Sequence, residues 1–439
     1  MPQVPASPTS LQIRNLNRSR ILTEIRRVPG VSRSQLAKMI GLTEASLSRI
    51  TRDLIADGLV AEREGAARPI RGRPNVGLWL RADGVHVLCV ALTAYEHKFS
   101  IVGSTGERVV EGSIPGLPGA TPEAVVDLLR DQIVALRKRP DINLDRLSGV
   151  AISISGDIDA RRRIAVSASG VGWNDCPLGQ LFEDALHVPV VLQSVSNALH
   201  IAEVRYGEGH VPPHSLLLHA GLGISASLMS NGMLSAGAEN ESGIEHILVG
   251  RGPGDPLRLT DVSSGRAILH RLGHPSAIDG SVTADVGLHL GLPHAVRQAN
   301  AGDPNAVAIF AEAGHRLVQS FLGVVALVHP EQIVLAGPLT AARPFVDAIR
   351  TGLREFIRST RIPEPAIIVG RTGYLRATEL TGLDRFLFSQ VADSHAAHQP
   401  VSEAMTPDAT TSGAMDPPQV PASPYLEDAV GRGIGRHSG

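Results

Sequence analysis

The stretch SRSQLAKMIGLTEASLSRITRDLIADGLV, residues 32–60, decides how the first part of this 439-residue chain folds. It predicts a short helix that begins with Ser32 or Ser34 as its N-cap and breaks at Gly41, followed by a second helix capped by Thr43. The buried faces of the two helices carry apolar residues at helical spacing: Leu36, Ala37 and Ile40 in the first and Leu47, Ile50, Leu54 and Ile55 in the second. Two short helices joined by a tight glycine turn form a helix-turn-helix, whose second helix enters the major groove of DNA.

The flanking residues extend this motif to a winged helix-turn-helix over residues 11–81. A preceding helix stops at Pro29-Gly30 and places apolar residues on one stripe, namely Leu16, Ile21, Leu22 and Ile25. Gly58 ends the last helix, and residues 59–62 and 76–80 follow as two strands. The segment between these strands is the predicted wing.

The residues expected to contact DNA lie on the helices and on the wing. On the helices they are small, polar or basic and do not obstruct docking: Ser34, Thr43, Glu44, Ala45, Ser46, Ser48, Arg49 and Arg52. In the wing, Arg71-Gly72-Arg73-Pro74 resembles the short arms that lay arginines into a narrow minor groove. A solvated hairpin loop is the alternative, but the position of this loop directly after a helix-turn-helix favours DNA contact by Arg71 and Arg73.

The charge distribution along the chain agrees with a polyanion-binding domain in residues 11–81. Residues 11–80 carry 13 Lys and Arg against 6 Asp and Glu, whereas the rest of the chain carries 28 against 37. The overall net charge of −2 conceals this asymmetry. A basic face on an ordinary helical domain would look the same, so the charge supports DNA binding without deciding it.

From residue 83 the chain alternates strands and helices over roughly 300 residues, which is typical of an α/β protein. Strands are predicted in VHVLCVAL, HKFSIVG, LSGVAISIS, VPVVLQ, HSLLLHAGLGISASLM and EQIVLAG. An antiparallel pair, a helix and a further strand occur in residues 85–155 and again in residues 215–337. We therefore expect two similar lobes, about 82–200 and about 201–375 within a domain of residues 82–390, with a cleft between them.

Together, the NRSRIL helix, the RGRP wing and the HPEQIVLAG strand resemble the ROK family of sugar kinases and sugar-responsive repressors, across roughly residues 15–390. The resemblance implies an actin-like ATPase fold behind the winged helix-turn-helix. The N-terminal domain is similar to that of the repressor branch, because the kinase branch begins directly at the first lobe. This resemblance implies a homodimer or homotetramer that is built on the C-terminal domain and binds a partly palindromic operator.

The kinase motifs of this family are degenerate in the chain. The Asp-Gly-Gly-Thr phosphate turn reads Ala91-Leu92-Thr93-Ala94, and the Asn-Asp pair that supplies the general base reads Ser194-Val195. Valine cannot accept a proton from a sugar hydroxyl. The second phosphate loop keeps two glycines in residues 221–225, which favours a simple strand-to-strand hairpin there. We expect no enzymatic activity and no cofactor.

The metal and sugar motifs are also incomplete. The family's zinc cysteines are missing after His246, so no metal is expected, because tetrahedral zinc requires four good ligands. Glu245 and His246 remain as candidate effector-binding residues in the interlobe cleft, but the Asn of the Ser-x-Asn-Leu-Gly-Trp segment is lost and Thr260 replaces a Glu. An ordinary hexose is therefore disfavoured. The cleft either recognises another small molecule or is a scaffold.

The remaining features concern location and the ends of the chain. No apolar run approaches the ~18 to 20 residues of a membrane helix, and MPQVPASPTS lacks the pattern of a secretory signal, so we expect a cytoplasmic, nucleoid-associated protein without membrane contact. Residues 1–10 and 391–439 are predicted to be disordered.

Three hypotheses follow. The leading one is a DNA-binding transcriptional regulator, acting as a repressor on double-stranded DNA. The alternatives are a sugar kinase with an accessory DNA-binding domain, and an assembly protein whose large domain only dimerises the DNA-binding domains.

Overall fold

The computed structural model describes residues 9–64, 76–93, 96–116, 119–136, 139, 142–168, 170–207, 211–235, 243–249, 257–274, 282–360 and 362–388. The wing residues Arg71 and Arg73, residues 1–8 and the C-terminal tail from residue 389 lie outside these ranges. Within them, no helix has the length and apolar character needed to cross a membrane.

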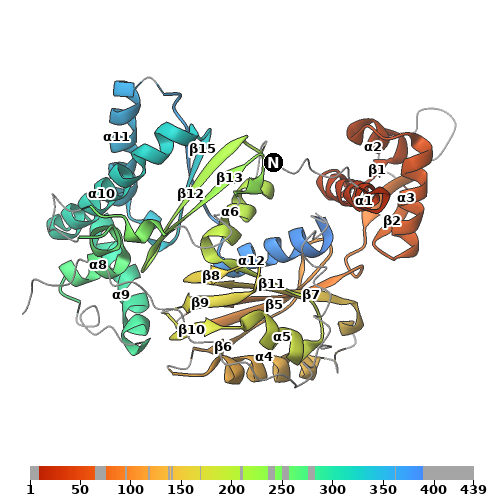
Figure 1. Cartoon of the computed structure of the whole chain (residues 1–439), viewed down its shortest axis with the longest axis horizontal. Coiled ribbons are helices and arrows are strands. Elements are labelled where there is room, and N and C mark those ends of the chain that lie inside the picture. The colour runs from red at the N-terminus through yellow and green to blue at the C-terminus, as the bar shows by residue number, and fades with distance from the viewer. Residues whose placement is uncertain are drawn as a thin grey trace, which may run out of the picture. The chain divides into compact units, whose positions relative to one another are not determined.

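The N-terminal domain, which we call the head, contains three helices and a small sheet in its described residues (Figure 1). Its elements are α1 (Ser10–Arg27), β1 (Val31–Ser32), α2 (Arg33–Ile40), α3 (Glu44–Ala56), β2 (Val60–Glu64) and β3 (Val76–Leu80). The strands form an antiparallel sheet in the order β1-β3-β2. This is the winged helix-turn-helix that the sequence predicts.

The start of α1 corrects two expectations. Thr9 caps the helix, since its hydroxyl accepts from the Gln12 N–H and its own N–H donates to the Gln12 side chain. Residues 9 and 10 therefore belong to ordered structure and not to the predicted disordered end. Leu16 was expected in the buried stripe but is 51% exposed, because the first turns of α1 extend beyond the packed part of the head.

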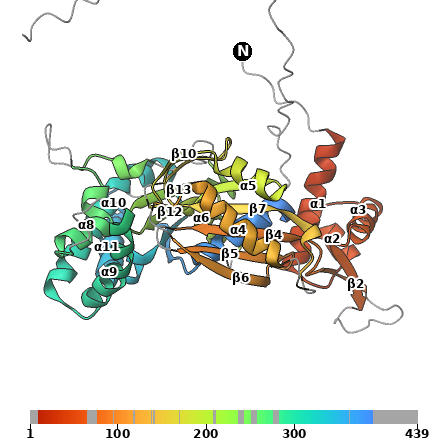
Figure 2. The same cartoon turned by 90° about the horizontal axis from the view of Figure 1, so that it is seen from below.

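Two five-stranded sheets with the same topology form the large domain (Figures 1 and 2). Lobe one has the order β11-β7-β4-β5-β6 and lobe two the order β14-β13-β12-β15-β16. In each sheet, two neighbouring antiparallel pairs adjoin two parallel ones. The predicted duplication and the α/β class are thus confirmed.

Lobe one is built from the first half of the large domain. Its elements are β4 (His86–Leu92), β5 (Glu96–Gly103), β6 (Arg108–Pro115), α4 (Pro122–Leu136), η1 (Leu144–Arg146), β7 (Leu147–Ile154), β8 (Asp157–Asp159), β9 (Ile164–Ala168), β10 (Trp173–Cys176), α5 (Leu178–Leu186) and β11 (Val190–Ser194). Strands β8, β9 and β10 form a separate antiparallel sheet. The helix α6 (Val195–Arg205) follows directly on β11.

Lobe two carries the longer helices. Its elements are β12 (His214–Ala220), β13 (Ile224–Ser230), β14 (Met233–Leu234), η2 (Ile244–His246), α7 (Thr260–Ser263), α8 (Gly265–Arg271), α9 (Val282–Asn300), α10 (Pro304–Val328), β15 (Gln332–Ala336), η4 (Pro338–Ala341), α11 (Arg343–Thr360) and β16 (Ala366–Val369). A core of leucine, isoleucine, alanine and phenylalanine side chains joins α9, α10 and α11 to this sheet.

The last helix, α12 (Tyr374–Leu383), returns to lobe one. It packs on β4, β7 and α6, and it continues into the π-helical turn η5 (Asp384–Phe388). Leu387 and Phe388 of this turn share one apolar core with Ile21, Leu22 and Ile25 of α1. The C-terminal helix therefore connects the core of lobe one with the core of the head.

Candidate functional site

The turn between α2 and α3 is set by local sequence signals. Ser32 is the N-cap of α2 and forms a capping box with Gln35, which selects Ser32 over Ser34. Gly41 ends α2 in the left-handed conformation, at φ 68°, which glycine adopts without strain. Thr43 caps α3 by accepting the Ser46 N–H at 3.3 Å, as predicted. These three signals hold the two helices in helix-turn-helix geometry.

Helix α3 presents one face to the core and the opposite face to solvent. Leu47, Ile50, Thr51 and Leu54 are buried. Ala45, Arg49 and Arg52 are exposed and follow one another at helical spacing along one stripe. Among the residues that the structure describes, neither guanidinium of this stripe has an acidic partner. Helix α3, the helix predicted to enter the major groove and called the reading helix below, thus carries two arginines that are available to a polyanion.

Other arginines of the head are used within it. Arg14 of α1 pairs with Asp53 of α3 at 2.8 Å, and Arg18 of α1 pairs with Asp57, the C-cap of α3, at 2.7 Å. These pairs fix α3 against α1 from its solvent side. Part of the positive charge counted in the sequence therefore stabilises the domain and is not free for a ligand.

Arg33 links the reading helix to the wing. Its Nε donates to the buried Thr51 hydroxyl at 3.2 Å, and its Nη1 pairs with Glu62 of β2. The Thr51 hydroxyl in turn donates to the Leu47 carbonyl at 3.0 Å. One guanidinium thus connects α2, α3 and the first wing strand.

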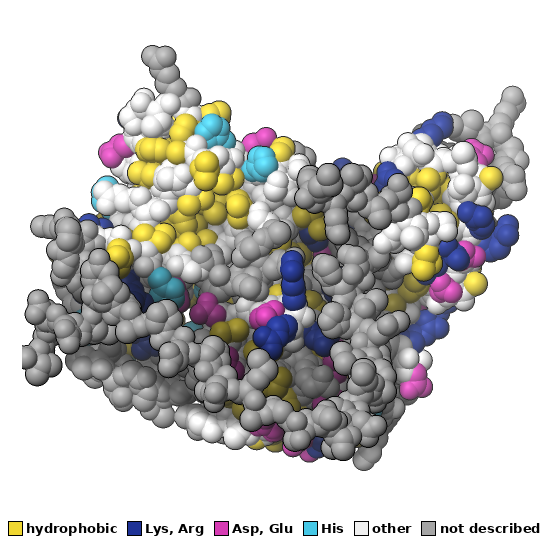
Figure 3. Space-filling view, in the orientation of Figure 1, with side chains coloured by type: hydrophobic (Ala, Val, Ile, Leu, Met, Phe, Trp, Pro, Cys, Tyr) yellow, Lys and Arg dark blue, Asp and Glu magenta, His cyan; other side chains and the backbone are white. Residues whose placement is uncertain are grey.

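The structure places the predicted DNA-contacting side chains on one domain, and several Lys and Arg side chains of the head are visible in Figure 3. Ser34, Glu44 and Ala45 are exposed near the N-terminal ends of α2 and α3, whereas Ser46 and Ser48 are half-buried. Arg71 and Arg73 lie outside the described residues, so their contact with DNA stays a prediction.

In lobe one, the positions of the kinase motifs hold apolar side chains. Ala91 and Leu92 are buried at the end of β4. Ser194 is the N-cap of α6, accepting the Asn197 N–H at 3.3 Å, and Val195 packs in a core with Leu217 and Val334. A hydrocarbon side chain in a core cannot act as a general base.

In lobe two, Gly221 and Gly223 form the tight turn between β12 and β13, with the Gly221 N–H donating to the Gly223 carbonyl at 2.9 Å. The Gly221 carbonyl accepts the Gly265 N–H at 2.8 Å, which is a hydrogen bond within lobe two. The turn is the strand-to-strand hairpin that the sequence predicts.

Glu245 and His246 lie together on η2, with Oε1 and Nε2 3.4 Å apart. Asp157, from lobe one, joins them, and one ligand-type atom from each of the three lies within 4.8 Å of the others. Burial raises the pKa of the Glu245 carboxyl; the neighbouring His246 opposes this rise and Asp157 adds to it. Polar groups of both lobes thus meet at the predicted effector residues. Asp157 was not singled out from the sequence, although it follows the end of a buried strand, where ligand-binding groups often stand.

The hydrogen bonds of His246 disfavour a metal at this cluster. Its Nδ1 accepts from the Arg258 guanidinium at 3.1 Å, so a neutral ring carries its proton on Nε2, toward Glu245. A metal ion would need the lone pair of that nitrogen and would lie beside the Arg258 cation. The expectation of no metal therefore gains a physical reason. Arg258, which lies 12 residues from His246 in the sequence, gave no sequence signal of its own.

Two family models match the chain. The model described as "ROK family" matches residues 88–374, and the model described as "MarR family" matches residues 15–68. The second match covers the helices of the head, and the first covers both lobes.

Repressors are among the similar proteins. The chain is 24% identical to the DNA-binding transcriptional repressor Mlc of Escherichia coli K12, over 80% of this chain and 87% of that protein. It is 25% identical to a putative xylose repressor of Caldicellulosiruptor sp. strain Rt8B.4, over 54% of this chain and 59% of that protein. The match thus spans only about three fifths of this xylose repressor.

Solved structures share the fold. A ROK family transcriptional regulator, a homolog of E. coli Mlc, aligns with a TM-score of 0.70 at 23% identity, over 86% of this chain and 98% of that chain. A ROK family glucokinase from Streptomyces griseus aligns with a TM-score of 0.53 at 20% identity, over 68% of this chain and 98% of that chain.

Proposed function

Because the chain belongs to the ROK family and begins with a winged helix-turn-helix, we propose that it is a DNA-binding transcriptional regulator that represses its target genes. The observation that carries this proposal is the exposed stripe of α3, where Arg49 and Arg52 face away from the core and have no acidic partner among the described residues. The repressor names of the similar proteins support it.

In this proposal, the N-terminal part of α3 reads base edges in the major groove. Ser34, Thr43, Glu44, Ala45, Ser46, Ser48, Arg49 and Arg52 are the contact residues of the helices, and Arg71 and Arg73 contact DNA from the wing. The protein acts at the nucleoid as a homodimer or homotetramer, so that two heads bind one operator.

DNA selection followed by titration tests this function. Genomic fragments retained by the full chain identify the operator, and fluorescence anisotropy then gives the affinity at several salt concentrations. We expect Arg49→Gln combined with Arg52→Gln to weaken operator binding about tenfold or more. Each lost phosphate contact should also reduce the salt slope by ~0.9.

Arg358→Gln, an exposed position on α11, is the matched control for loss of positive charge. It should leave the operator affinity unchanged. Binding that ignores both salt and the α3 substitutions would refute the assignment of α3. Arg71→Ala with Arg73→Ala tests the wing in the same assay.

We also propose that the protein does not transfer phosphate. The support is the buried Val195 at the position of the general base and the loss of an acid at Ala91. Incubation with ATP and a panel of hexoses should produce no sugar phosphate. Turnover above background, abolished by mutation of the cleft, would favour the kinase hypothesis instead.

A small-molecule effector bound by Glu245 and His246 is the regulatory part of the proposal. Asp157 and Arg258 supply further polar groups from both sides of these residues. A ligand that binds only the folded protein raises its melting temperature, so a thermal-shift screen of small polar molecules tests this site. We expect glucose to leave the melting temperature unchanged. An effector should raise the melting temperature of the wild type, and Glu245→Gln should abolish this rise.

A further inference from the structure

A pocket with a volume of about 280 Å³ lies beside the first turn of α12, away from Glu245 and His246. Gly373, Tyr374 and Arg376 line it from α12, and Lys98 and Arg108 line it from β5 and β6. Three of its lining side chains are cationic and come from three different elements, and two, Glu96 and Glu111, are anionic.

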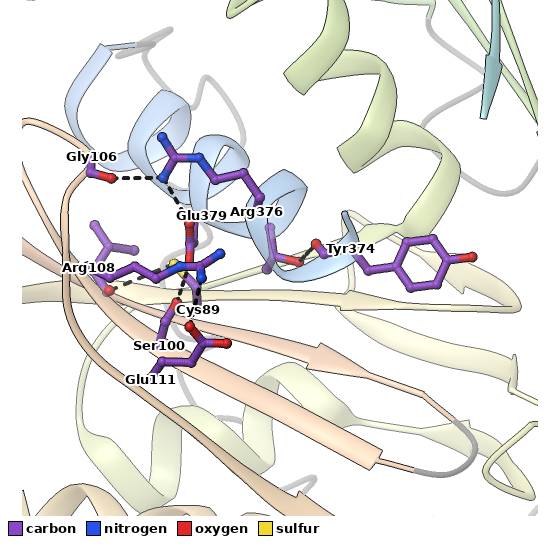
Figure 4. Close-up of polar contacts among 10 residues, drawn as sticks. Cys89, Ser100, Gly106, Arg108, Glu111, Tyr374, Arg376 and Glu379 are labelled. Atoms are coloured by element: carbon purple, nitrogen blue, oxygen red, sulfur yellow. Dashed lines mark hydrogen bonds and ion pairs between the residues drawn. The ribbon is translucent and has the colours of Figure 1, made fainter. Parts of the chain in front are cut away.

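A buried carboxylate fixes two of these cations. Glu379 is fully buried, and it accepts hydrogen bonds from Arg108 Nε at 2.6 Å and from Arg376 Nη1 at 2.8 Å. Figure 4 shows the two guanidiniums approaching Glu379 from two sides. The Ser100 hydroxyl donates to the same carboxylate at 2.8 Å, and the Gly106 carbonyl accepts from Arg376 at 2.8 Å. The guanidinium positions are thus set before any ligand arrives, which lowers the entropic cost of binding.

Both arginines keep donors for a ligand. Arg108 uses Nε for Glu379 and Nη1 for Glu111, at 2.7 Å, and Arg376 uses only Nη1. Within the described ranges, Nη2 of each arginine has no acceptor. The Arg108 side chain is 38% exposed and that of Arg376 is 40% exposed, so a ligand can reach both residues. Hydrogen bonding to Glu379 raises the pKa of Arg108 further, so this group stays charged.

The rest of the lining contains charged groups of both signs and the N-terminal end of α12. Lys98 lies on the rim in a half-exposed pair with Glu96, at 3.3 Å, where the attraction is screened by water. The N-terminal end of α12 has no side-chain cap and lines the pocket, and the positive end of a helix dipole favours a nearby anion. Glu96 and Glu111 also line the pocket, where Glu96 pairs with Lys98 and Glu111 with Arg108.

We propose that this pocket, the α12 pocket, binds a small organic anion through Arg108, Arg376 and Lys98. The recognised chemistry is a carboxylate or a phosphate group, since planar guanidiniums match both with paired hydrogen bonds. The binding itself does not depend on the proposed function. Its consequence for DNA binding does, because it assumes that the head is a repressor domain.

That consequence follows from the continuity of α12 with η5. The ligand would contact the first turn of α12, and the Phe388 carbonyl at the end of η5 accepts the Ser19 hydroxyl of α1. Asp384 of the same turn pairs with Arg205, the last residue of α6. One continuous helical segment thus joins the pocket to the head, and we infer that an anion in the α12 pocket changes the DNA affinity.

Isothermal titration calorimetry of the full chain tests the site. Sodium citrate and inorganic phosphate serve as probes for carboxylate and phosphate, with glucose as the neutral comparison. We expect saturable binding of at least one anion and no binding of glucose. Lys98→Gln combined with Arg376→Lys should weaken the anion about tenfold or more, whereas Arg358→Gln on α11 should not.

Arg376→Lys keeps a positive charge beside Glu379, so the buried carboxylate is not left unpaired and the fold is preserved. An unchanged melting temperature of the variant verifies this point. The proposal is overturned if neither anion binds at concentrations on the order of 10 mM, if glucose binds equally, or if the control variant loses binding together with the pocket variant.

Anisotropy with the selected operator, with and without the bound anion, tests the regulatory consequence. A shift in DNA affinity that the pocket variant removes supports it, and an unchanged affinity overturns it. Failure of DNA binding itself would refute the proposed function but leave the calorimetric result valid, so the two failures are distinguishable.

Discussion

The guanidinium carbon of Arg26 lies 4.2 Å from the centre of the Tyr206 ring, so the last turn of α1 stacks on the end of α6. The same guanidinium lies 5.2 Å from the Phe388 ring of η5. Cation–π contacts of this kind contribute about 0.5 to 2 kcal/mol, more when water is excluded. Arg26 therefore contributes to the contact between the head and the large domain.

We expect Arg26→Ala to loosen this contact. Amide hydrogen exchange across α1 should become faster by a factor corresponding to about 1 kcal/mol, while exchange in lobe two stays unchanged. Arg27→Ala is the control, because Arg27 is 72% exposed and lies 3.9 Å from its partner Glu24. Equal acceleration in both variants would show that loss of charge, and not loss of the ring contact, causes the effect.

The cap of the reading helix provides a second test. Thr43→Ala removes the acceptor of the Ser46 N–H and should destabilise the first turn of α3 by about 1 kcal/mol. Exchange protection of the α3 amides and operator affinity should both fall. Thr43→Ser keeps the hydroxyl and should restore protection, so a loss of the same size in both variants would contradict the capping role.

The acid sensitivity of the fold should depend on His200. Burial lowers its pKa to about 3, and its ring is hydrogen-bonded to the hydroxyls of Ser215 and Ser227, each at 2.9 Å. The unfolded chain takes up this proton near pH 6.5, whereas the folded chain does so only near pH 3. The buried neutral His200 ring therefore contributes fully to the free energy of unfolding above pH 6.5. Below pH 6.5 this free energy falls by about 1.4 kcal/mol per pH unit.

Melting temperatures measured from pH 7 to pH 5 check this expectation. His200→Gln should flatten the decline, since glutamine does not titrate. His315→Gln, at an exposed position on α10, should leave the pH dependence of the wild type unchanged. A decline that is identical in all three proteins would assign the acid sensitivity to other groups.

Two glycines in helices should respond to alanine in opposite directions. A Cβ on Gly382 of α12 would lie 2.8 Å from the side chains of Ala151 and Val87, so Gly382→Ala forces α12 away from lobe one. The resulting strain, about 1 to 3 kcal/mol, exceeds the gain of up to ~1 kcal/mol in helix propensity. We expect a lower melting temperature.

Gly323 of α10 is the matched position, because a Cβ placed there has no described atom within 4 Å apart from its chain neighbours and the adjacent backbone of its own helix. Gly323→Ala should raise the melting temperature through helix propensity alone. Calorimetry of both variants compares the two effects, and a shift of the same sign in both would contradict the packing argument.

The sequence by itself determined the head and the class of the large domain. Thr43 and Gly41 act on backbone groups only a few residues away, and the spacing of Leu47, Ile50 and Leu54 follows from one helical period. Such signals are local, so they can be read without knowing the rest of the fold. Leu16 was misjudged because periodicity alone does not show where packing against a neighbour ends.

Only the tertiary structure decided which distant groups meet. Glu379 accepts from Arg108 across 271 positions of the chain, and Asp157 reaches Glu245 from the other lobe. Such contacts depend on how the duplicated sheets are placed and on the return of α12 to lobe one, and no local pattern encodes them. The sequence therefore specified the elements of the winged helix-turn-helix, because each is stabilised largely by near neighbours, while the α12 pocket and its connection to the head required the complete fold.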